Sequence, residues 1–334
     1  MLAVPISNRT LFGLETKAER YTLVFWCLFA LIINFTGNSL ILLATVKYKS
    51  IKLDKISVVL IQNIAFSDIM MGICTIHPTM VSLIADRWVY GDFMCYLSHY
   101  LKVPIFISAV LLICAMHISK LLNIIQPLQA RLRTKREGYR LVIITWFLCF
   151  IIPVTQLALD KESVTFDYRL YRCHYVFRGL YWKWLRPILI GTLMVLPNVV
   201  VICTTVALLV YVKVTTKQLN YQGILTALYV GLVYILSCAP VSLNQSVITN
   251  LYPVMSRDVY WFFFVPYCRY AFFVTFLNST SNVFVYMVSV LSFRRFVMNK
   301  ILGNCLRKLS LIHNTSTSRV AIVWSRKATG RKSG

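Results

Sequence analysis

Charged residues are scarce in this chain. They make up 14% of its 334 residues, whereas hydrophobic residues make up 58%. A soluble domain is nearer one quarter charged, because its surface must face water. The chain therefore has too few polar groups to cover a soluble surface, and we expect it to lie in a lipid bilayer.

Several signals of other protein classes are also missing. Residues 1–20 are polar and contain no apolar stretch of the signal-peptide kind, so we expect the first apolar run to act as its own insertion signal. The 10 cysteines form no cluster with metal-ligand spacing, and most lie in apolar runs, where a thiol behaves as a small hydrophobe. Because no nucleophile, metal cluster or acid pair is visible either, we expect that the chain is not an enzyme and has no resident cofactor.

Long apolar runs dominate what is present. A helix crosses the hydrocarbon of a bilayer in about 20 apolar residues. Seven runs are long enough: Tyr21–Val46, Ile56–Ala85, Cys95–Asn123, Tyr139–Leu159, Leu185–Val212, Gly223–Asn250 and Val259–Leu291. The fold class predicted is an all-α membrane protein, a seven-transmembrane helix bundle. It comprises an extracellular N-terminus (1–20), the bundle (21–291), and a cytoplasmic amphipathic helix with a basic tail (292–334).

The basic residues are distributed unevenly between the two sides. The 47–55, 120–140 and 213–222 segments and the tail from residue 293 hold 22 basic and two acidic residues, against 13 basic and eight acidic on the other side. Positive loops stay cytoplasmic, which places the N-terminus outside and the C-terminus inside. The formal charge of +24 then reflects orientation in the plasma membrane rather than nucleic-acid binding. The tail is also suited to contact anionic lipid.

Different short motifs occur along the successive runs and in the loop after the second run. They are Gly37-Asn38, Asn63-Ile64-Ala65-Phe66-Ser67-Asp68, Trp88 to Cys95, Trp146, Pro197, Pro240 and Asn282-Val283-Phe284-Val285-Tyr286. In this order the set resembles the rhodopsin-like (class A) family of G-protein-coupled receptors, over about residues 21–305. The resemblance implies an extracellular ligand, a heterotrimeric G protein as partner, and arrestin as a further one.

Asp68 lies mid-membrane, where a carboxylate is costly and by default functional. One interpretation is a neutral core acid that is satisfied by Asn38. The resemblance instead implies an allosteric sodium site that links the second and seventh helices, with further oxygens from Asn278, Ser279 and Asn282. Ala109 stands where the family usually has a serine, which leaves a sodium ion less well coordinated.

Two cysteines face the outer side. Cys95 begins the third run and Cys173 lies in the loop before the fifth, and because the outer side is oxidising we expect a disulfide rather than two free thiols. The sequon at Asn8 fits glycosylation on the same side. On the inner side, Cys305 is a candidate for palmitoylation, with an unmodified thiol as the alternative.

The inner end of the third run departs from the family pattern. Ser119-Lys120-Leu121 occupies the place of the usual Asp-Arg-Tyr. Lys120 keeps the positive charge but lacks the planar fork of arginine, and Ser119 removes the neighbouring carboxylate. The hypothesis that follows is a less firmly latched inactive state.

Three other switch positions differ as well. Cys238-Ala239-Pro240 replaces Cys-Trp-x-Pro, and Tyr234, one turn away, is expected to take over part of the missing packing. Val283 replaces the proline before Tyr286, so the seventh helix should kink less. Thr205 stands where the fifth helix usually has a tyrosine.

The outer third of the bundle contains bases and, by expectation, no acids. Lys102 lies about two turns below Cys95. Either its side chain extends to the interface, or it needs an anion, which favours a ligand with a carboxylate, a phosphate or a peptide C-terminus. The ligand-binding residues predicted are Lys102, His99, His77, Arg186, Arg269, Trp261 and Tyr270.

On the inner face, Ser292 to Phe296 is predicted to be an amphipathic helix with Phe293 and Phe296 toward lipid and the arginines toward water. Two alternatives to an ordinary receptor stay open. A receptor of this fold could couple weakly and act as a scavenger or heteromer partner. A seven-helix transporter or channel would instead show paired broken helices or a chain of intramembrane charges.

Overall fold

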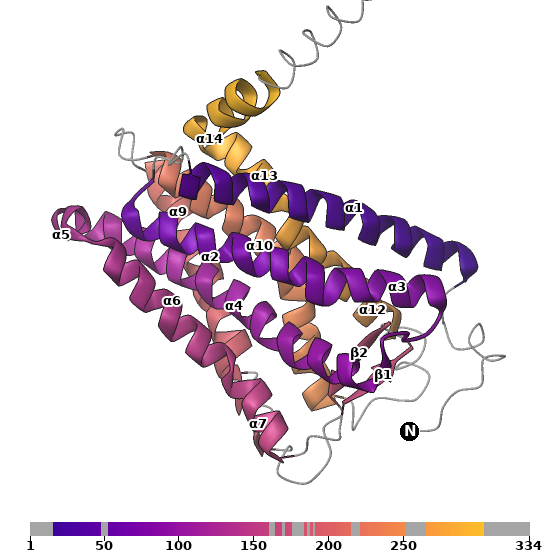
Figure 1. Cartoon of the computed structure of the whole chain (residues 1–334). Coiled ribbons are helices and arrows are strands. Elements are labelled where there is room, and N and C mark those ends of the chain that lie inside the picture. The colour runs from indigo at the N-terminus through magenta and orange to yellow at the C-terminus, as the bar shows by residue number, and fades with distance from the viewer. Residues whose placement is uncertain are drawn as a thin grey trace, which may run out of the picture.

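The molecule is an elongated helical bundle, shown in Figure 1. This computed structural model describes residues 16–47, 53–159, 164–168, 171–175, 184–185, 188–189, 191–214, 221–251 and 265–303. Its longer helices are α1 (Lys17–Leu42), α2 (Lys55–Met71), α3 (His77–Ala85), α4 (Gly91–Ile125), α6 (Lys135–Cys149), α7 (Ile151–Leu159), α9 (Leu196–Val214), α10 (Tyr221–Leu251), α12 (Val265–Val274) and α13 (Phe276–Ser289). The short helices are α5 (Pro127–Leu132) and α14 (Leu291–Arg295).

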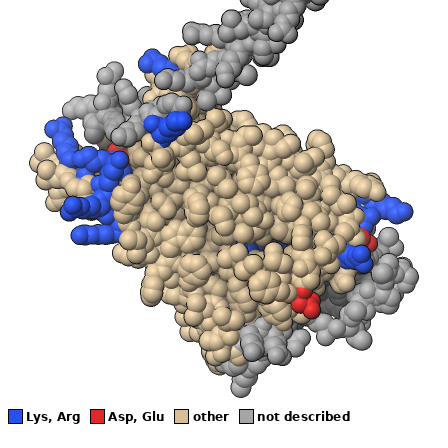
Figure 2. Space-filling model, viewed as in Figure 1, with Lys and Arg blue, Asp and Glu red and all other residues tan. Residues whose placement is uncertain are grey.

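These helices combine into seven crossings. Six helices of the described chain are long and apolar enough to cross a membrane, and α10, with its apolar stretch Gly223–Cys238, is the seventh. Large apolar side chains such as Phe25, Phe147 and Leu236 are exposed along their outer faces. On the face in Figure 2, Lys and Arg side chains gather at the two ends of the bundle. The prediction of a seven-helix membrane bundle is confirmed.

Helix starts follow local capping rules. The Thr16 hydroxyl accepts from the Glu19 amide while the Glu19 carboxylate accepts from the Thr16 amide, a capping box that begins α1 four residues before the expected run. Thr134 and Glu137 form a second box at α6. Asp54 caps α2 by accepting from the Ser57 amide.

Three crossings change helical geometry just before a proline. The π-helical segment Gly72–Ile76 precedes Pro78, the segment Gly191–Val195 precedes Pro197, and the break at Phe150 between α6 and α7 precedes Pro153. Proline lacks an N–H and its ring clashes with the carbonyl four residues earlier. In these three crossings the α-helix widens or breaks in that turn.

A two-stranded hairpin covers the end of the bundle that the charge distribution predicts to face outward, called the outer end below, and the opposite end is called the inner end. Strands β1 (Val164–Asp167) and β2 (Arg172–Tyr175) pair antiparallel, with Phe166 opposite Cys173. In Figure 1 the hairpin lies at the end of α4 that is remote from α5. It is the part of the long outer loop between α7 and α9 that the structure describes.

α1 and α13 come into close contact at Gly37. A methyl group placed on Gly37 would lie 2.8 Å from Cγ1 of Val283. Val283 is the residue that replaces the family's proline, and α13 runs through it without a break from Phe276 to Ser289. The absence of a side chain at Gly37 is thus what lets a branched residue occupy this place.

We predict that Gly37→Ala destabilises the bundle, because the added methyl group cannot avoid Val283. An overpacked site of this kind costs about 1–3 kcal/mol, which should appear as a fall in the melting temperature of the purified protein. Gly191→Ala is the control, since a side-chain carbon there meets nothing within 4 Å. Val283→Ala should recover much of the loss in the double variant, and simple additivity of the two changes would contradict the argument.

Candidate functional site

The centre of the bundle holds a buried polar layer around Asp68 of α2. The Asn282 side chain of α13 donates from Nδ2 to Oδ2 of Asp68 over 2.6 Å. Both residues are almost fully buried. Asn282, not Asn38, is therefore the partner of the carboxylate, and the interpretation that Asn38 satisfies Asp68 is wrong. The contact joins the second and seventh crossings directly.

Two asparagines of α1 complete this layer. Asn38 donates from Nδ2 to the Ser279 carbonyl over 2.9 Å, and Asn34 donates to the backbone carbonyl of Asp68 over 2.9 Å. Asn278 is buried one residue before Ser279. Sequence reasoning missed Asn34, although it lies four residues before Asn38 and so on the same helix face.

A serine pair extends the polar layer to α4. The Ser67 and Ser108 hydroxyls are 3.0 Å apart, and both are buried. Ser108 also donates to the Ile105 carbonyl. Ser108, one residue before Ala109, thus joins α4 to α2 through Ser67, the residue that precedes Asp68.

Tyr234 connects α10 to α9. Its hydroxyl donates to Oδ1 of Asn198 over 2.8 Å, and its side chain is fully buried. Cys238, one turn further on, is buried and within 3.8 Å of the Ser237 hydroxyl. Pro240 lies inside α10, where its carbonyl accepts from the Tyr267 hydroxyl. These contacts are made in the part of α10 where the family usually has its tryptophan.

The inner end of α4 is held by an ion pair. Lys120 is buried, and its ammonium pairs with the carboxylate of Asp54, the capping residue of α2. Burial raises the pKa of Asp54, but Lys120 and the Ser57 amide outweigh it and hold the pKa below its usual value. The carboxylate next to Lys120 in the sequence is indeed missing at Ser119, but an acid at the start of α2 pairs with Lys120 instead.

Lys120 is also covered by α10. A methyl group on Gly223, in the first turn of α10, would lie 3.0 Å from the Lys120 ammonium nitrogen. Ser119 is buried and Leu121 is half-buried beside it. The start of α10 thus lies against the Lys120–Asp54 pair, at the end of the bundle where α5 is labelled in Figure 1.

α14 packs inward. Phe293 is fully buried and contacts the Tyr286 ring edge-on at 6.2 Å, and Phe296 is also buried. Arg294 and Arg295 are exposed. The prediction that the two phenylalanines face lipid is wrong, since they close the core beneath Tyr286.

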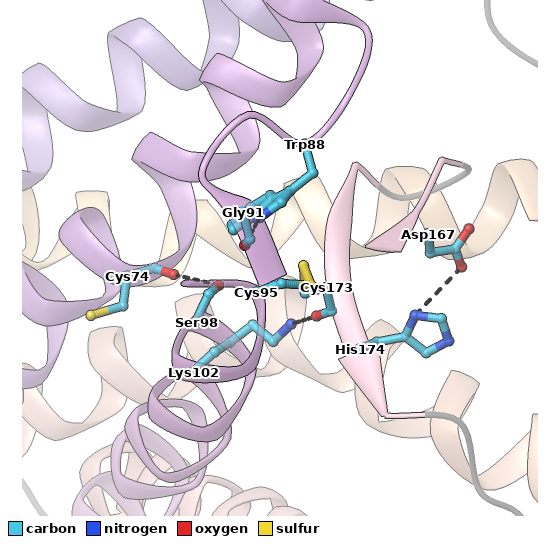
Figure 3. Close-up of a disulfide and its surroundings, with 9 residues drawn as sticks. All are labelled: Cys74, Trp88, Gly91, Cys95, Ser98, Lys102, Asp167, Cys173 and His174. Carbon is cyan, nitrogen blue, oxygen red and sulfur yellow. Dashed lines mark hydrogen bonds and ion pairs between the residues drawn. A yellow bond between two sulfur atoms is a disulfide. The ribbon is translucent and has the colours of Figure 1, made fainter. Parts of the chain in front are cut away.

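A disulfide joins the outer end of α4 to the hairpin. Cys95 and Cys173 are bonded, with their Cα atoms 5.4 Å apart, as predicted. Figure 3 shows the bond beside Trp88, whose indole N–H donates to the Gly91 carbonyl over 2.8 Å. The hairpin is consequently fixed over the third crossing.

Lys102 lies beneath this hairpin. Its ammonium donates to the Cys173 carbonyl over 2.6 Å, as Figure 3 shows. His99, one turn nearer the outer end, is hydrogen-bonded to Gln156 of α7 at 3.0 Å. His77 is exposed and close to the Tyr90 ring. The predicted ligand-binding bases thus differ in their surroundings. Lys102 and His99 both contact the hairpin, since the His99 ring also stacks on the Tyr175 ring of β2 at 6.1 Å.

Arg269 and Tyr270 of α12 bind an acid of α1. Arg269 is buried and pairs with Glu19 at 3.1 Å, while the Tyr270 hydroxyl donates to the same carboxylate over 2.6 Å. The expectation that no acid approaches the outer bases is therefore wrong. Glu19 was missed because it precedes the apolar run. Arg186, Trp261, Asn8 and Cys305 lie outside the described residues.

Comparison with known proteins agrees with this architecture. Residues 37–251 match the model of the seven-transmembrane receptor (rhodopsin family). The rat neuropeptide Y receptor type 5 is 31% identical over 40% of this chain and 29% of its own length. The human C-C chemokine receptor type 1 is 29% identical over 59% of this chain and 54% of its own.

A cholecystokinin receptor of Xenopus laevis is 26% identical over 46% of this chain and 32% of its own length. The chain thus spans about a third of the neuropeptide Y and cholecystokinin receptors it matches. The family match covers more than half of the chain and includes Asp68, the Cys95–Cys173 bond and Lys120. The chain belongs to the rhodopsin family of seven-transmembrane receptors.

Proposed function

We propose that this chain is a receptor that binds an extracellular ligand and activates a heterotrimeric G protein from the plasma membrane. Family membership supports a receptor rather than an enzyme. The single observation that carries the coupling mechanism is the Lys120–Asp54 pair, against which the start of α10 lies. A ligand that favours a state in which α10 moves away would expose this inner end to a partner.

The names of the relatives bear on the ligand. Relatives include neuropeptide Y receptors and a QRFP-like peptide receptor of Branchiostoma floridae. On that basis we propose that the ligand of this chain is also a peptide. The hairpin fixed by Cys95–Cys173 forms part of the outer surface that such a ligand meets first.

The partner on the inner side would meet α5. Leu128 and Leu132 are 78% and 79% exposed there, close in sequence to the exposed bases Arg131 and Arg136. An apolar surface of this kind, rimmed by charge, suits a protein partner. A G protein is the partner proposed, and arrestin is a second that would use the same end.

An allosteric sodium ion is also part of the proposal. Asp68 supplies a carboxylate, and Oδ1 of Asn38 and of Asn34 are buried acceptors with no hydrogen-bond donor. These oxygens fit a hard cation. We predict that replacing NaCl by choline chloride lowers the melting temperature of the wild type but not that of Asp68→Asn. An equal response of the two proteins to the exchange of salt would refute the site.

Breaking the inner ion pair should raise basal signalling. Asn is as good a helix cap as Asp, so Asp54→Asn removes the charge and keeps the α2 cap. If the pair contributes about 1.4 kcal/mol to the closed state, its loss multiplies the open population about tenfold. The measurement is guanine-nucleotide exchange on purified heterotrimeric G proteins in receptor-containing nanodiscs, without ligand and with a peptide panel.

Glu137→Gln is the matched control, because Glu137 is an inner-end acid that caps α6 and lies outside the Lys120 pair. It should leave basal exchange unchanged. Basal exchange that is the same in Asp54→Asn and the wild type would contradict the proposal that the Lys120–Asp54 pair stabilises the closed state. A wild type that promotes no exchange with any G protein or peptide would favour the alternative of a weakly coupling scavenger or heteromer partner.

The proposed orientation is tested separately with epitope tags. A tag before Met1 should bind antibody on intact cells, whereas one after Gly334 should bind only after permeabilisation, because the 22-base side stays cytoplasmic. Asn8→Gln should increase gel mobility if the sequon is glycosylated. Access to both tags from the same compartment would overturn the arrangement.

A further inference from the structure

Two cations lie together under the outer hairpin. Lys102 of α4 and Arg172 of β2 are both partly buried. The Lys102 ammonium donates to the Cys173 carbonyl, the residue that follows Arg172. The Arg172 guanidinium carbon lies 4.0 Å from the centre of the Phe272 ring on α12. The strand β2 thus places Arg172 next to the residue that Lys102 contacts.

Neither cation has a carboxylate within ion-pair distance in the described part of the chain. Lys102 has three N–H donors and uses one, on a neutral carbonyl. The side chain of Arg172 makes no hydrogen bond to the described residues, and its Nε is buried. Burial lowers the pKa of Arg172 to about 10, although Asp167 and Cys268 oppose the shift, so the guanidinium keeps its charge at neutral pH.

The nearby acids are engaged elsewhere. Asp167 lies opposite Arg172 in the hairpin register, but its carboxylate is 3.9 Å from His174. Glu19 binds Arg269 and Tyr270. Asp86 binds Arg20 and Tyr171. Among the described residues, one acid therefore faces two basic side chains and a histidine, and basic groups are in excess beneath the hairpin.

An excess of partly buried charge is unfavourable without a partner. Arg269, in the same outer third, shows the structural alternative, since it is buried with Glu19 supplied by the fold. Within the ranges that the structure describes, no such acid is supplied to Lys102. A cation without an acidic partner from the fold is therefore better explained by an anionic group that a ligand supplies.

We propose that Lys102 and Arg172 together bind one carboxylate group of the extracellular ligand, with Phe272 as the apolar floor under the guanidinium. The inference rests on the receptor function proposed above, and adds to it the ligand chemistry and Arg172 as a binding residue. The Lys102 ammonium would act as a point donor, and the Arg172 fork would offer paired N–H groups to the two carboxylate oxygens. The carboxylate is either a peptide C-terminus or that of a small acid.

The first test compares melting temperatures of purified, ligand-free receptor. Lys102→Gln keeps a donor for the Cys173 carbonyl but removes the charge, so it should raise the melting temperature by about 2 °C. Arg269→Met is the matched control and should lower it, because the Glu19 carboxylate then loses its cation and keeps only hydrogen bonds. If Lys102 only supports the hairpin, Lys102→Gln gives no rise, and that result overturns the proposal.

The second test adds probes with and without a carboxylate. Phenylacetate and the dipeptide Gly-Phe are compared with phenylacetamide and Gly-Phe-amide, at millimolar concentration. The acids should raise the melting temperature of the wild type, whereas the amides should not, and the acid effect should be lost in Lys102→Gln and in Arg172→Gln. A larger effect of the dipeptide would identify the peptide C-terminus as the source, and a larger effect of phenylacetate the small acid.

Equal effects of acid and amide, or an acid effect that survives in Arg172→Gln, would overturn the site. Neither result bears on the coupling proposal, because the nucleotide-exchange assay measures activation of G proteins at the inner end. Conversely, absent exchange with an intact acid effect would remove the coupling proposal while retaining the carboxylate site. The two proposals can therefore fail independently.

Discussion

A polar side chain in the hydrocarbon interior has no water to bind, so its partner must come from the protein. This constraint explains why the contacts between crossings converge on the Asp68 layer. Asp68 binds Asn282, Asn34 binds the Asp68 backbone, and Asn38 binds the Ser279 backbone. Crossings one, two and seven are thereby fixed against one another by groups that would be costly to leave unpaired.

The two ends of the bundle are held by different means. At the outer end, a covalent bond ties the hairpin to α4, and the Glu19–Arg269 pair ties α1 to α12. At the inner end, the connection to α4 is the Lys120–Asp54 ion pair. An ion pair can open and re-form whereas a disulfide cannot under oxidising conditions, so conformational change is easier at the inner end.

The departures from the family pattern are accompanied by local compensation. Val283 occupies the space that Gly37 leaves open, Ser108 supplies a hydroxyl one residue before Ala109, and Lys120 finds Asp54 in place of an adjacent acid. Each compensation comes from a residue on another helix or at a neighbouring position. Four altered switches therefore coexist with a packed core around Tyr234 and Tyr286.

The sequence by itself determined the membrane class, the seven crossings, the Cys95–Cys173 bond and the buried position of Asp68. These follow from run length, compartment chemistry and the order of motifs, which act along the chain. Only the tertiary structure decided which groups meet: Asn282 rather than Asn38 at Asp68, Asp54 at Lys120, Glu19 at Arg269, and Phe293 beneath Tyr286 rather than toward lipid. Helical periodicity gives the face on which a residue lies, but the partner depends on the rotation and depth of a second helix, and that is set by packing of the whole bundle.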